Sequence, residues 1–293
     1  GLDINRDALL LQSPEGHVLK AVRDRLQPRI GFNLHNQNWR TSVGMPPRPA
    51  TISLLSVAFD KAGTENEGRR LTKRTCAIIR DALEPLAPGQ IGRYDEDFEV
   101  RAFGDNITLW GTPVVLIETG PWASSQPDPP LVRLNFVAIL TALDALASGR
   151  VASADPARYE MLPVNDERLF YILIKHASIV NGAGVAAFTG DVGITTTRRV
   201  RSEGGARSVV LPLTIDDLGD LRIFSGLTEI DGTGLTVAPL FDPSLQAGAE
   251  VALPRDWAEV QPPRTISVGE PAVLVVLKPS TTADRFIVVR VIQ

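Results

Sequence analysis

Two residue types suited to catalysis stand at the ends of apolar runs in the first half of the sequence. The run "IGFNL" is followed by His35, and the run "VVLI" is followed by Glu118. In open α/β sheets ligands bind just outside the carboxyl ends of strands, so two such endings predict one site. An imidazole can bind a metal ion, and a carboxylate beside a metal-bound water can accept its proton. His35 and Glu118 therefore indicate metal-assisted hydrolysis; the alternative is a hydrogen-bonded structural histidine and a glutamate paired with an arginine.

The elements that must position these two residues alternate between helix and strand. Ser13 and Pro14 predict the N-cap and first position of a helix. Residues 45–64, punctuated by proline and glycine, indicate a long loop. Four further segments carry helix or strand patterns: a strand over 29–35, a helix over 65–86, a buried strand over 111–120 and a helix over 131–147. This alternation predicts a mainly parallel sheet covered by helices over residues 1–150.

The second half differs from the first in composition and in its pattern of apolar residues. From about Val151 the segment "ASADPAR" indicates a linker, and the remainder is dense in valine, isoleucine, threonine, glycine and proline. Short β-branched runs alternate with turn signals such as "SEGG" and "DGTG". This pattern is typical of a β-sandwich or barrel and predicts an all-β domain over residues 160–293.

Composition narrows the classes of partner. The net charge is -4, with acids and bases mixed along the chain, so no basic field is expected to hold nucleic acid or an anionic membrane. We also expect no apolar stretch long enough to span a bilayer, and hence a soluble protein. The single cysteine, Cys76, excludes an internal disulfide but leaves localisation open, with export to the periplasm among the alternatives.

Three motifs occur in order along residues 1–150. They are "GLDINRD" followed by a helix opening on "PE", then "GFNLHNQN", then "FEVRAFGDNITLWGTPVVLIETG". Together they resemble the carboxypeptidase A-like zinc metallocarboxypeptidases of the bacterial type. The resemblance implies part of a phosphorylase/hydrolase-like mixed sheet with flanking helices, and a metallopeptidase that acts in proteolysis. It implies that His35 is a zinc ligand and that Glu118 is the catalytic general base.

The same resemblance implies roles in substrate binding for three more residues. Arg6 would clamp the terminal carboxylate of the substrate, because a guanidinium presents paired donors to two carboxylate oxygens. Asn5 would donate a hydrogen bond beside it, and Tyr94 would lie over the substrate. The alternatives are a surface arginine and a packed loop tyrosine. Arg101 and Asp105 are expected to form a structural ion pair that braces the loop before the second strand.

One part of the family pattern is missing. The family supplies its first two zinc ligands as His-x-x-Glu, and this motif is absent from the sequence. A catalytic zinc generally needs three protein ligands. We therefore expect the two other ligands upstream of Gly1, and expect this chain alone to bind zinc weakly or not at all and to be inactive. The alternative is a degenerate protein that binds peptide ends without hydrolysing them.

The second half resembles the small composite β-sandwich of the amidohydrolases, on segments such as "TEIDGTGLTVAPLFDP" and "RTISVGEPAVLVVL", but without their metal-binding barrel. We expect a structural or substrate-guiding domain. The preferred function is zinc-dependent hydrolysis of C-terminal residues of peptides. The alternatives are a zinc deacylase of N-acyl amino acids, of aspartoacylase type, and a non-catalytic peptide-binding module. The expected partner is thus a peptide or an acylated amino acid, and the oligomeric state is open.

Overall fold

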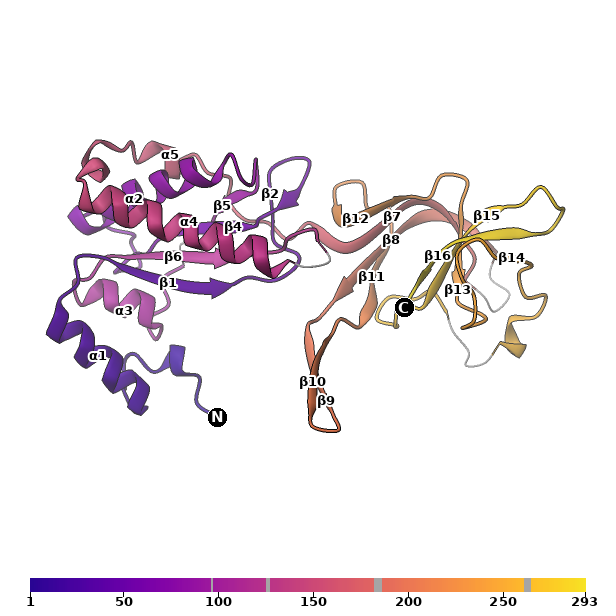
Figure 1. Ribbon diagram of the computed structural model, residues 1–293, viewed down its shortest axis with the longest axis horizontal. Helices are drawn as coiled ribbons and strands as arrows, with labels where there is room; N and C mark the ends of the chain where they lie inside the picture. Colours follow the sequence, from indigo (N-terminus) through magenta and orange to yellow (C-terminus); the bar gives the residue numbers. More distant parts are fainter. Residues whose placement is uncertain (96, 125–126, 182–185, 261–264) are drawn as a thin grey trace. The chain divides into compact units, whose positions relative to one another are not determined.

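The chain divides into two compact units in the computed structural model, which describes residues 1–293 except 96, 125–126, 182–185 and 261–264 (Figure 1). Unit 1 comprises Gly1–Glu167 and unit 2 comprises Arg168–Gln293. Unit 1 is mixed α/β, and unit 2 consists mostly of β-strands. The coarse class predicted from the sequence, an α/β part followed by a β-rich part, is confirmed.

A four-stranded mixed sheet lies at the centre of unit 1. Its strands are β1 (Gly31–Asn36), β4 (Ile52–Ser56), β5 (Ile91–Arg93) and β6 (Val114–Thr119). The order is β1-β6-β4-β5; β1 is parallel to β6 and β4 is parallel to β5, while β4 and β6 are antiparallel. The sheet is therefore less parallel than expected, since its central pairing is antiparallel.

The prediction of a long loop over residues 45–64 is wrong. Ile52–Ser56 forms β4, every residue of which is buried between β6 and β5. A hairpin of β2 (Ser42–Val43) and β3 (Arg48–Pro49) precedes it. The run "ISLLS" is short and follows several prolines, so its local pattern is that of a loop, and its strand conformation depends on the two neighbours that cover its edges.

Helices cover both faces of this sheet (Figure 1). The helices of unit 1 are α1 (Pro14–Leu26), α2 (Glu67–Leu83), α3 (Phe103–Leu109), α4 (Asp128–Ala147) and α5 (Ala157–Glu160), with 3-10 turns η1 (Ile4–Arg6) and η2 (Arg150–Ser153). Helices α2 and α4 pack on one face of the central strands, in a core that includes Ile52, Leu54 and Ile117. Helix α3 packs on the other face, where Ile107 contacts the cluster that contains Leu55.

A local signal accounts for the start of α1, whereas the segment after Val151 differs from the prediction. The predicted start of α1 is confirmed, because the Ser13 hydroxyl accepts a hydrogen bond from the Gly16 N–H at 3.1 Å with Pro14 at the first helical position. The expected linker after Val151 instead forms η2 and α5. Tyr159 of α5 is fully buried, and its hydroxyl accepts a hydrogen bond from the Ser56 N–H at 3.1 Å. This bond ties the end of unit 1 to its central strand.

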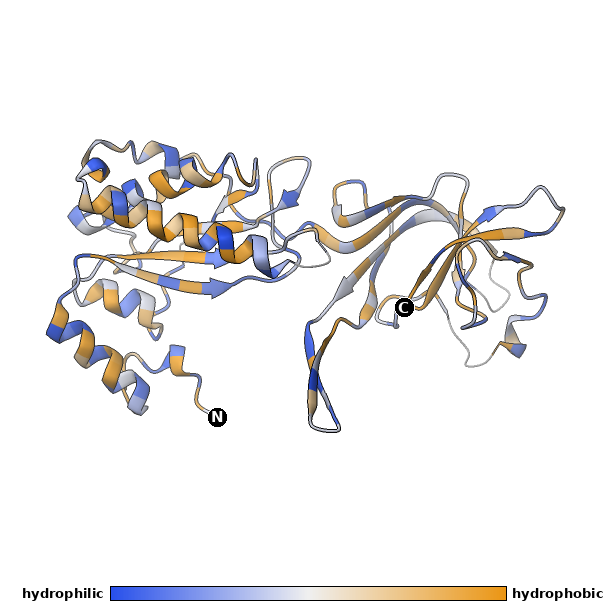
Figure 2. Ribbon diagram, viewed as in Figure 1, coloured by the Kyte–Doolittle hydropathy of each residue, from blue (hydrophilic) through white to orange (hydrophobic). Residues whose placement is uncertain are grey.

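Helix α4 differs from the expectation that no segment could span a bilayer. Among the described residues it is the one helix long and apolar enough to do so by length and composition, with a mean hydropathy of 1.6. Figure 2 shows apolar residues along most of this helix. One stripe, which includes Leu134 and Ala138, is buried in the core shared with α2, whereas Phe136 and Leu140 on another stripe are 64% and 54% exposed.

Unit 2 is built on one connected eight-stranded sheet and contains no closed barrel in its described part. Its elements are β7 (Leu169–Ile179), β8 (Phe188–Thr196), β9 (Arg199–Glu203), β10 (Ala206–Val210), β11 (Leu213–Gly219), β12 (Ser225–Asp231), β13 (Thr236–Pro239), β14 (Glu250–Val251), η3 (Trp257–Glu259), β15 (Leu274–Pro279) and β16 (Phe286–Ile292). The sheet order is β11-β8-β7-β13-β15-β16-β14, and β12 also pairs with β7; a separate hairpin joins β9 and β10. Its core among the described residues comprises an apolar cluster around Ile174 and Val276, a second around Val275 and Leu277, and a smaller one around Phe170 and Leu173.

Candidate functional site

His35 and Glu118 lie side by side in the sheet of unit 1. Strands β1 and β6 are parallel, and their register places His35 opposite Glu118. Ser53 of β4 lies opposite Glu118 on its other side. Side chains of laterally paired residues point to the same face of a sheet. The structure therefore brings together the two strand-end residues singled out in the sequence, on the face that α3 covers.

Glu118 has an unusual environment for a carboxylate. The residue is only 6% exposed, and its Oε2 atom has no hydrogen-bond partner among the described residues. Burial disfavours the charged form and raises the pKa of Glu118 to about 7. A carboxyl group with a pKa near neutrality can both accept and release a proton at physiological pH. Such a perturbed group is a candidate for acid–base chemistry.

Tyr94 packs on the face of the sheet that carries Glu118. It follows β5, and its N–H donates to the Leu54 carbonyl at 3.0 Å. Its half-buried ring packs against the cluster that contains Leu55 and Leu116. Burial and then the negative charge of Glu118 raise the pKa of the Tyr94 hydroxyl. The phenol therefore stays protonated and can donate a hydrogen bond near the Glu118 carboxyl group.

A hydrogen-bonded triangle borders the site and was not found from the sequence. Ser53 Oγ donates to Asn165 Oδ1 at 2.8 Å, Asn165 Nδ2 donates to Gln37 Oε1 at 2.8 Å, and Gln37 Nε2 donates to Ser53 Oγ at 3.0 Å. Gly92 leaves room for it, since a Cβ there would lie 2.5 Å from Asn165 Oδ1. The amide-rich segment "HNQN" indicated that Gln37 could lie at a polar site. No local sequence pattern indicated a role for Asn165. The triangle joins the end of β1 to β4 beside Glu118.

Asn5 and Arg6 belong to η1, and Asn5 contacts the first residue of α3. The Asn5 side-chain oxygen accepts a hydrogen bond from the Phe103 N–H at 3.0 Å, which leaves the amide nitrogen as a free donor among the described residues. Arg6 Nε lies 3.7 Å from a carboxylate oxygen of Glu99, and its side chain is 40% exposed. Gly104, the second residue of α3, packs so closely on Asn33 that a Cβ would come within 2.9 Å of Asn33 Nδ2.

Because Asn33 and His35 are two residues apart on β1, their side chains share one face of the sheet. Asn5 and Arg6 are therefore on the same side of the sheet as His35 and Glu118. In the described part of the chain, no ion pair or hydrogen bond joins Arg6 to Glu118.

The expected ion pair between Arg101 and Asp105 is not formed. Arg101 binds Glu99 instead, through Nε to Oε1 at 3.0 Å and Nη2 to Oε2 at 2.9 Å. These bonds hold the pKa of Glu99 down to about 2. Asp105 accepts a hydrogen bond from the Glu99 N–H at 3.2 Å, and burial raises its pKa. Glu99, which the sequence analysis did not single out, is thus the residue that braces this loop.

No protein-family model, curated protein or solved structure matches the chain.

The zinc ion implied by the resemblance does not fit the ligands that the described residues supply. Within the described ranges there is no group of three or more histidine, cysteine, aspartate or glutamate side chains that could hold a metal ion. His35 has Glu118 beside it and no third ligand in that part of the chain. His17 lies on α1 and His176 lies on β7 in unit 2. Since a stable zinc site needs three protein ligands or more, the described residues of this chain alone do not form one.

Proposed function

We propose that unit 1 contributes the general base of a hydrolytic site of metallocarboxypeptidase type. Glu118 is this base and accepts a proton. The observation that carries this proposal is the burial of Glu118 beside His35, with a pKa of about 7 and a carboxylate oxygen that has no partner among the described residues. A base of this pKa can take a proton from an attacking water and return it to the leaving amine. Tyr94 would donate a hydrogen bond to the reacting group.

Arg6 and Asn5 would bind the terminal carboxylate of a peptide substrate. Arg6 already interacts with a carboxylate, that of Glu99, and keeps its side chain 40% exposed. The Asn5 side-chain oxygen is bound to the Phe103 N–H, so the amide nitrogen is the donor that remains for a ligand. A guanidinium and an amide donor together match the two oxygens of a carboxylate. The substrate carboxylate would compete with Glu99 for Arg6.

The proposal assigns no step to zinc in this chain, because the described residues contain no group of three ligands that could hold it. Unit 2 is proposed as an accessory β-sandwich, since none of the residues assigned to the site belongs to it.

Calorimetric titration with a matched pair of ligands tests the binding part. A dipeptide with a free C-terminal carboxylate is compared with its C-terminal amide, using the wild-type chain, Arg6→Gln and Arg25→Gln. Arg25 is an exposed residue of α1 and serves as the charge-matched control. We expect the free dipeptide to bind more tightly, and only Arg6→Gln to remove the difference. Equal binding of acid and amide by the wild-type chain would contradict the carboxylate clamp.

Turnover assays test the catalytic part. Hydrolysis of the dipeptide and of an N-acyl amino acid is measured with added Zn²⁺, for the wild-type chain and for Glu118→Gln. Preferential hydrolysis of the acylated amino acid would favour the deacylase, and activity retained by Glu118→Gln would exclude Glu118 as the base.

A second candidate is the non-catalytic module that binds peptide ends. It is favoured by the missing third ligand in the described part of the chain. This module predicts carboxylate-dependent binding without turnover of either substrate, and turnover of either one by the chain with added Zn²⁺ would contradict it.

A further inference from the structure

Unit 1 has a pocket at the amino ends of β1 and β6, the ends opposite to those that carry His35 and Glu118. It has a volume of about 350 Å³, within the usual range for small-ligand sites. Its walls come from the residues before β1 and β6, from the first turns of α2 and from η2. The lining residues are Arg29, Glu67, Gly68, Arg70, Leu71, Arg74, Pro113, Val151 and Ala152.

Positive charge dominates this pocket, although the chain as a whole has a net charge of -4. Three arginines line it against a single carboxylate, that of Glu67. Among the described residues only Arg70 contacts that carboxylate, with Nη2 3.4 Å from Glu67 Oε1. Arg74 Nε is buried and has no hydrogen-bond partner in the same part of the chain. A buried donor without a partner costs free energy, so a ligand that accepts from Arg74 would relieve a cost that is present in the free protein.

The start of α2 adds backbone donors to the same pocket. Asn66 caps the helix by accepting from the Arg69 N–H at 2.8 Å, while the N–H groups of Glu67 and Gly68 bind no acceptor in the described part of the chain. Gly68 lies so close to Pro113 that a Cβ would come within 2.7 Å of the proline Cγ. Glu67 and Gly68 of this first turn both line the pocket. Free N–H groups at a helix N-terminus attract anions.

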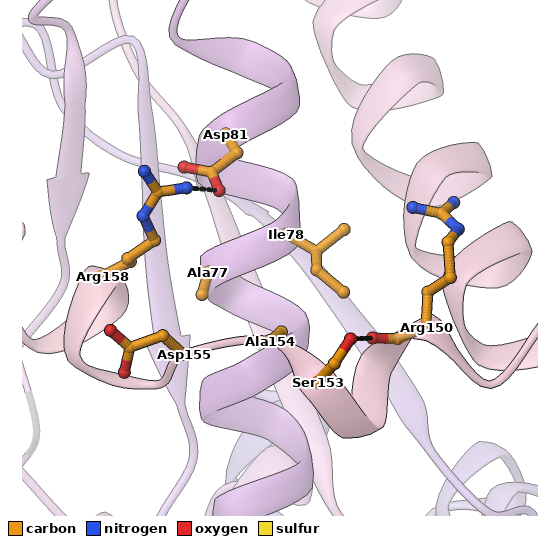
Figure 3. Close-up of a pocket in the computed structure, with 8 residues that line it drawn as sticks. All are labelled: Ala77, Ile78, Asp81, Arg150, Ser153, Ala154, Asp155 and Arg158. Carbon is orange, nitrogen blue, oxygen red and sulfur yellow. Dashed lines mark hydrogen bonds and ion pairs between the residues drawn. The ribbon is translucent and has the colours of Figure 1, made fainter.

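A neighbouring pocket also contains arginines and carboxylates, but its charges are balanced (Figure 3). It lies between α2 and the η2–α5 segment and contains two arginines and two aspartates. There Arg158 is ion-paired with Asp81, and Arg150 is ion-paired with Asp144 of α4. Those arginines already have carboxylate partners. Arg29 and Arg74 have none among the described residues, which distinguishes the two pockets.

We propose that the pocket lined by Arg29, Arg70 and Arg74 binds a small phosphate-bearing ligand. Guanidinium groups match the oxygens of phosphate in pairs, and a dianion balances the excess of two positive charges on the lining side chains. The site is independent of the hydrolytic function proposed for Glu118. It lies at the amino ends of β1 and β6, whereas His35 and Glu118 lie at their carboxyl ends.

Calorimetric titration of the full chain with inorganic phosphate, and separately with a phosphate monoester, tests this proposal at constant ionic strength. The variants are Arg74→Gln and Arg29→Gln, and Arg133→Gln serves as a charge-matched control at an exposed position of α4. We expect saturable binding of at least one ligand and a loss of about tenfold or more for each pocket variant, the size of one charge-assisted hydrogen bond. Tighter binding of the monoester indicates a phosphorylated metabolite, and binding of phosphate alone indicates the free ion.

Two results would overturn the proposal. One is the lack of saturable binding of both ligands to the wild-type chain. The other is a loss of affinity in the pocket variants no greater than in Arg133→Gln. Arg29 is exposed, so Arg29→Gln provides a test that does not depend on packing of the partly buried Arg74.

Discussion

Replacing Glu118 by glutamine should stabilise unit 1 relative to the wild-type chain, and this stabilisation should be larger at pH 8 than at pH 4. Burial raises the pKa of Glu118 from 4.5 to about 7. Below pH 4.5 the group is protonated in both the folded and the unfolded chain. As the pH rises from 4.5 to 7, the unfolded chain releases this proton and the folded chain retains it, so the free energy of unfolding falls. Above pH 7 the loss is complete.

The size of the effect follows from the two pKa values. Their difference of about 2.5, at about 1.36 kcal/mol for each pH unit, gives about 3 kcal/mol. Glutamine does not titrate, so Glu118→Gln lacks this loss. The difference in free energy of unfolding between variant and wild type should therefore move in favour of the variant by about 3 kcal/mol between pH 4 and pH 8.

Urea unfolding followed by tryptophan fluorescence at several pH values measures this difference. Trp39, Trp110 and Trp122 belong to unit 1, and Trp257 belongs to unit 2. A Trp257→Phe background makes the signal report unit 1 alone, which is needed because two units can unfold separately.

Glu99→Gln is the matched control with the opposite sign. Hydrogen bonds from Arg101 lower the pKa of Glu99 to about 2, so its stabilising effect is present above pH 4.5 and is lost as the pH falls toward 2. That variant should change the pH dependence only on the acid side. A difference between Glu118→Gln and wild type that stays constant from pH 4 to pH 8 would refute the argument, because Glu118 would then titrate near its ordinary value.

Three further substitutions probe the packing around the site and in unit 2, each by urea unfolding. Asn165→Ala opens the hydrogen-bonded triangle and should cost about 1–3 kcal/mol, since two polar side chains lose partners; an unchanged stability would show that water replaces the amide. Tyr159→Phe removes the acceptor of the Ser56 N–H and should cost about 1–2 kcal/mol, unless that buried N–H finds another acceptor. Gly193→Ala places a Cβ 2.6 Å from the Phe170 ring and should cost unit 2 about 1–3 kcal/mol; a neutral result would mean that the ring moves freely.

The adjacency of His35 and Glu118 was predictable because each residue ends an apolar strand, and a short apolar run is a local signal. Parallel neighbours then bring such ends together. The start of α1 was predictable for a similar reason, since the Ser13 cap and Pro14 act within one helical turn. Both predictions depended on interactions between residues close in sequence or on a general rule of sheet topology.

The features missed from the sequence depend on distant residues. Strand β4 has only five residues, and its conformation is determined by β6 and β5 on its two edges. Ser53 and Asn165 of the triangle are separated by 112 positions. Arg6 reaches Glu99 because the start of the chain packs on α3, and no motif indicated that the pair would form.

The state of Glu118 also reports whether a cation binds beside it. Burial alone raises its pKa, and no cationic side chain among the described residues lies near enough to lower it. A cation held at His35, the paired residue on β1, would favour the carboxylate and lower that pKa. Repeating the pH series with Zn²⁺ should therefore reduce the stability lost between pH 4.5 and pH 7 if His35 and other ligands bind the metal beside Glu118. A pH dependence that Zn²⁺ leaves unchanged is the result expected of this chain, because its described residues supply too few ligands to hold zinc beside Glu118.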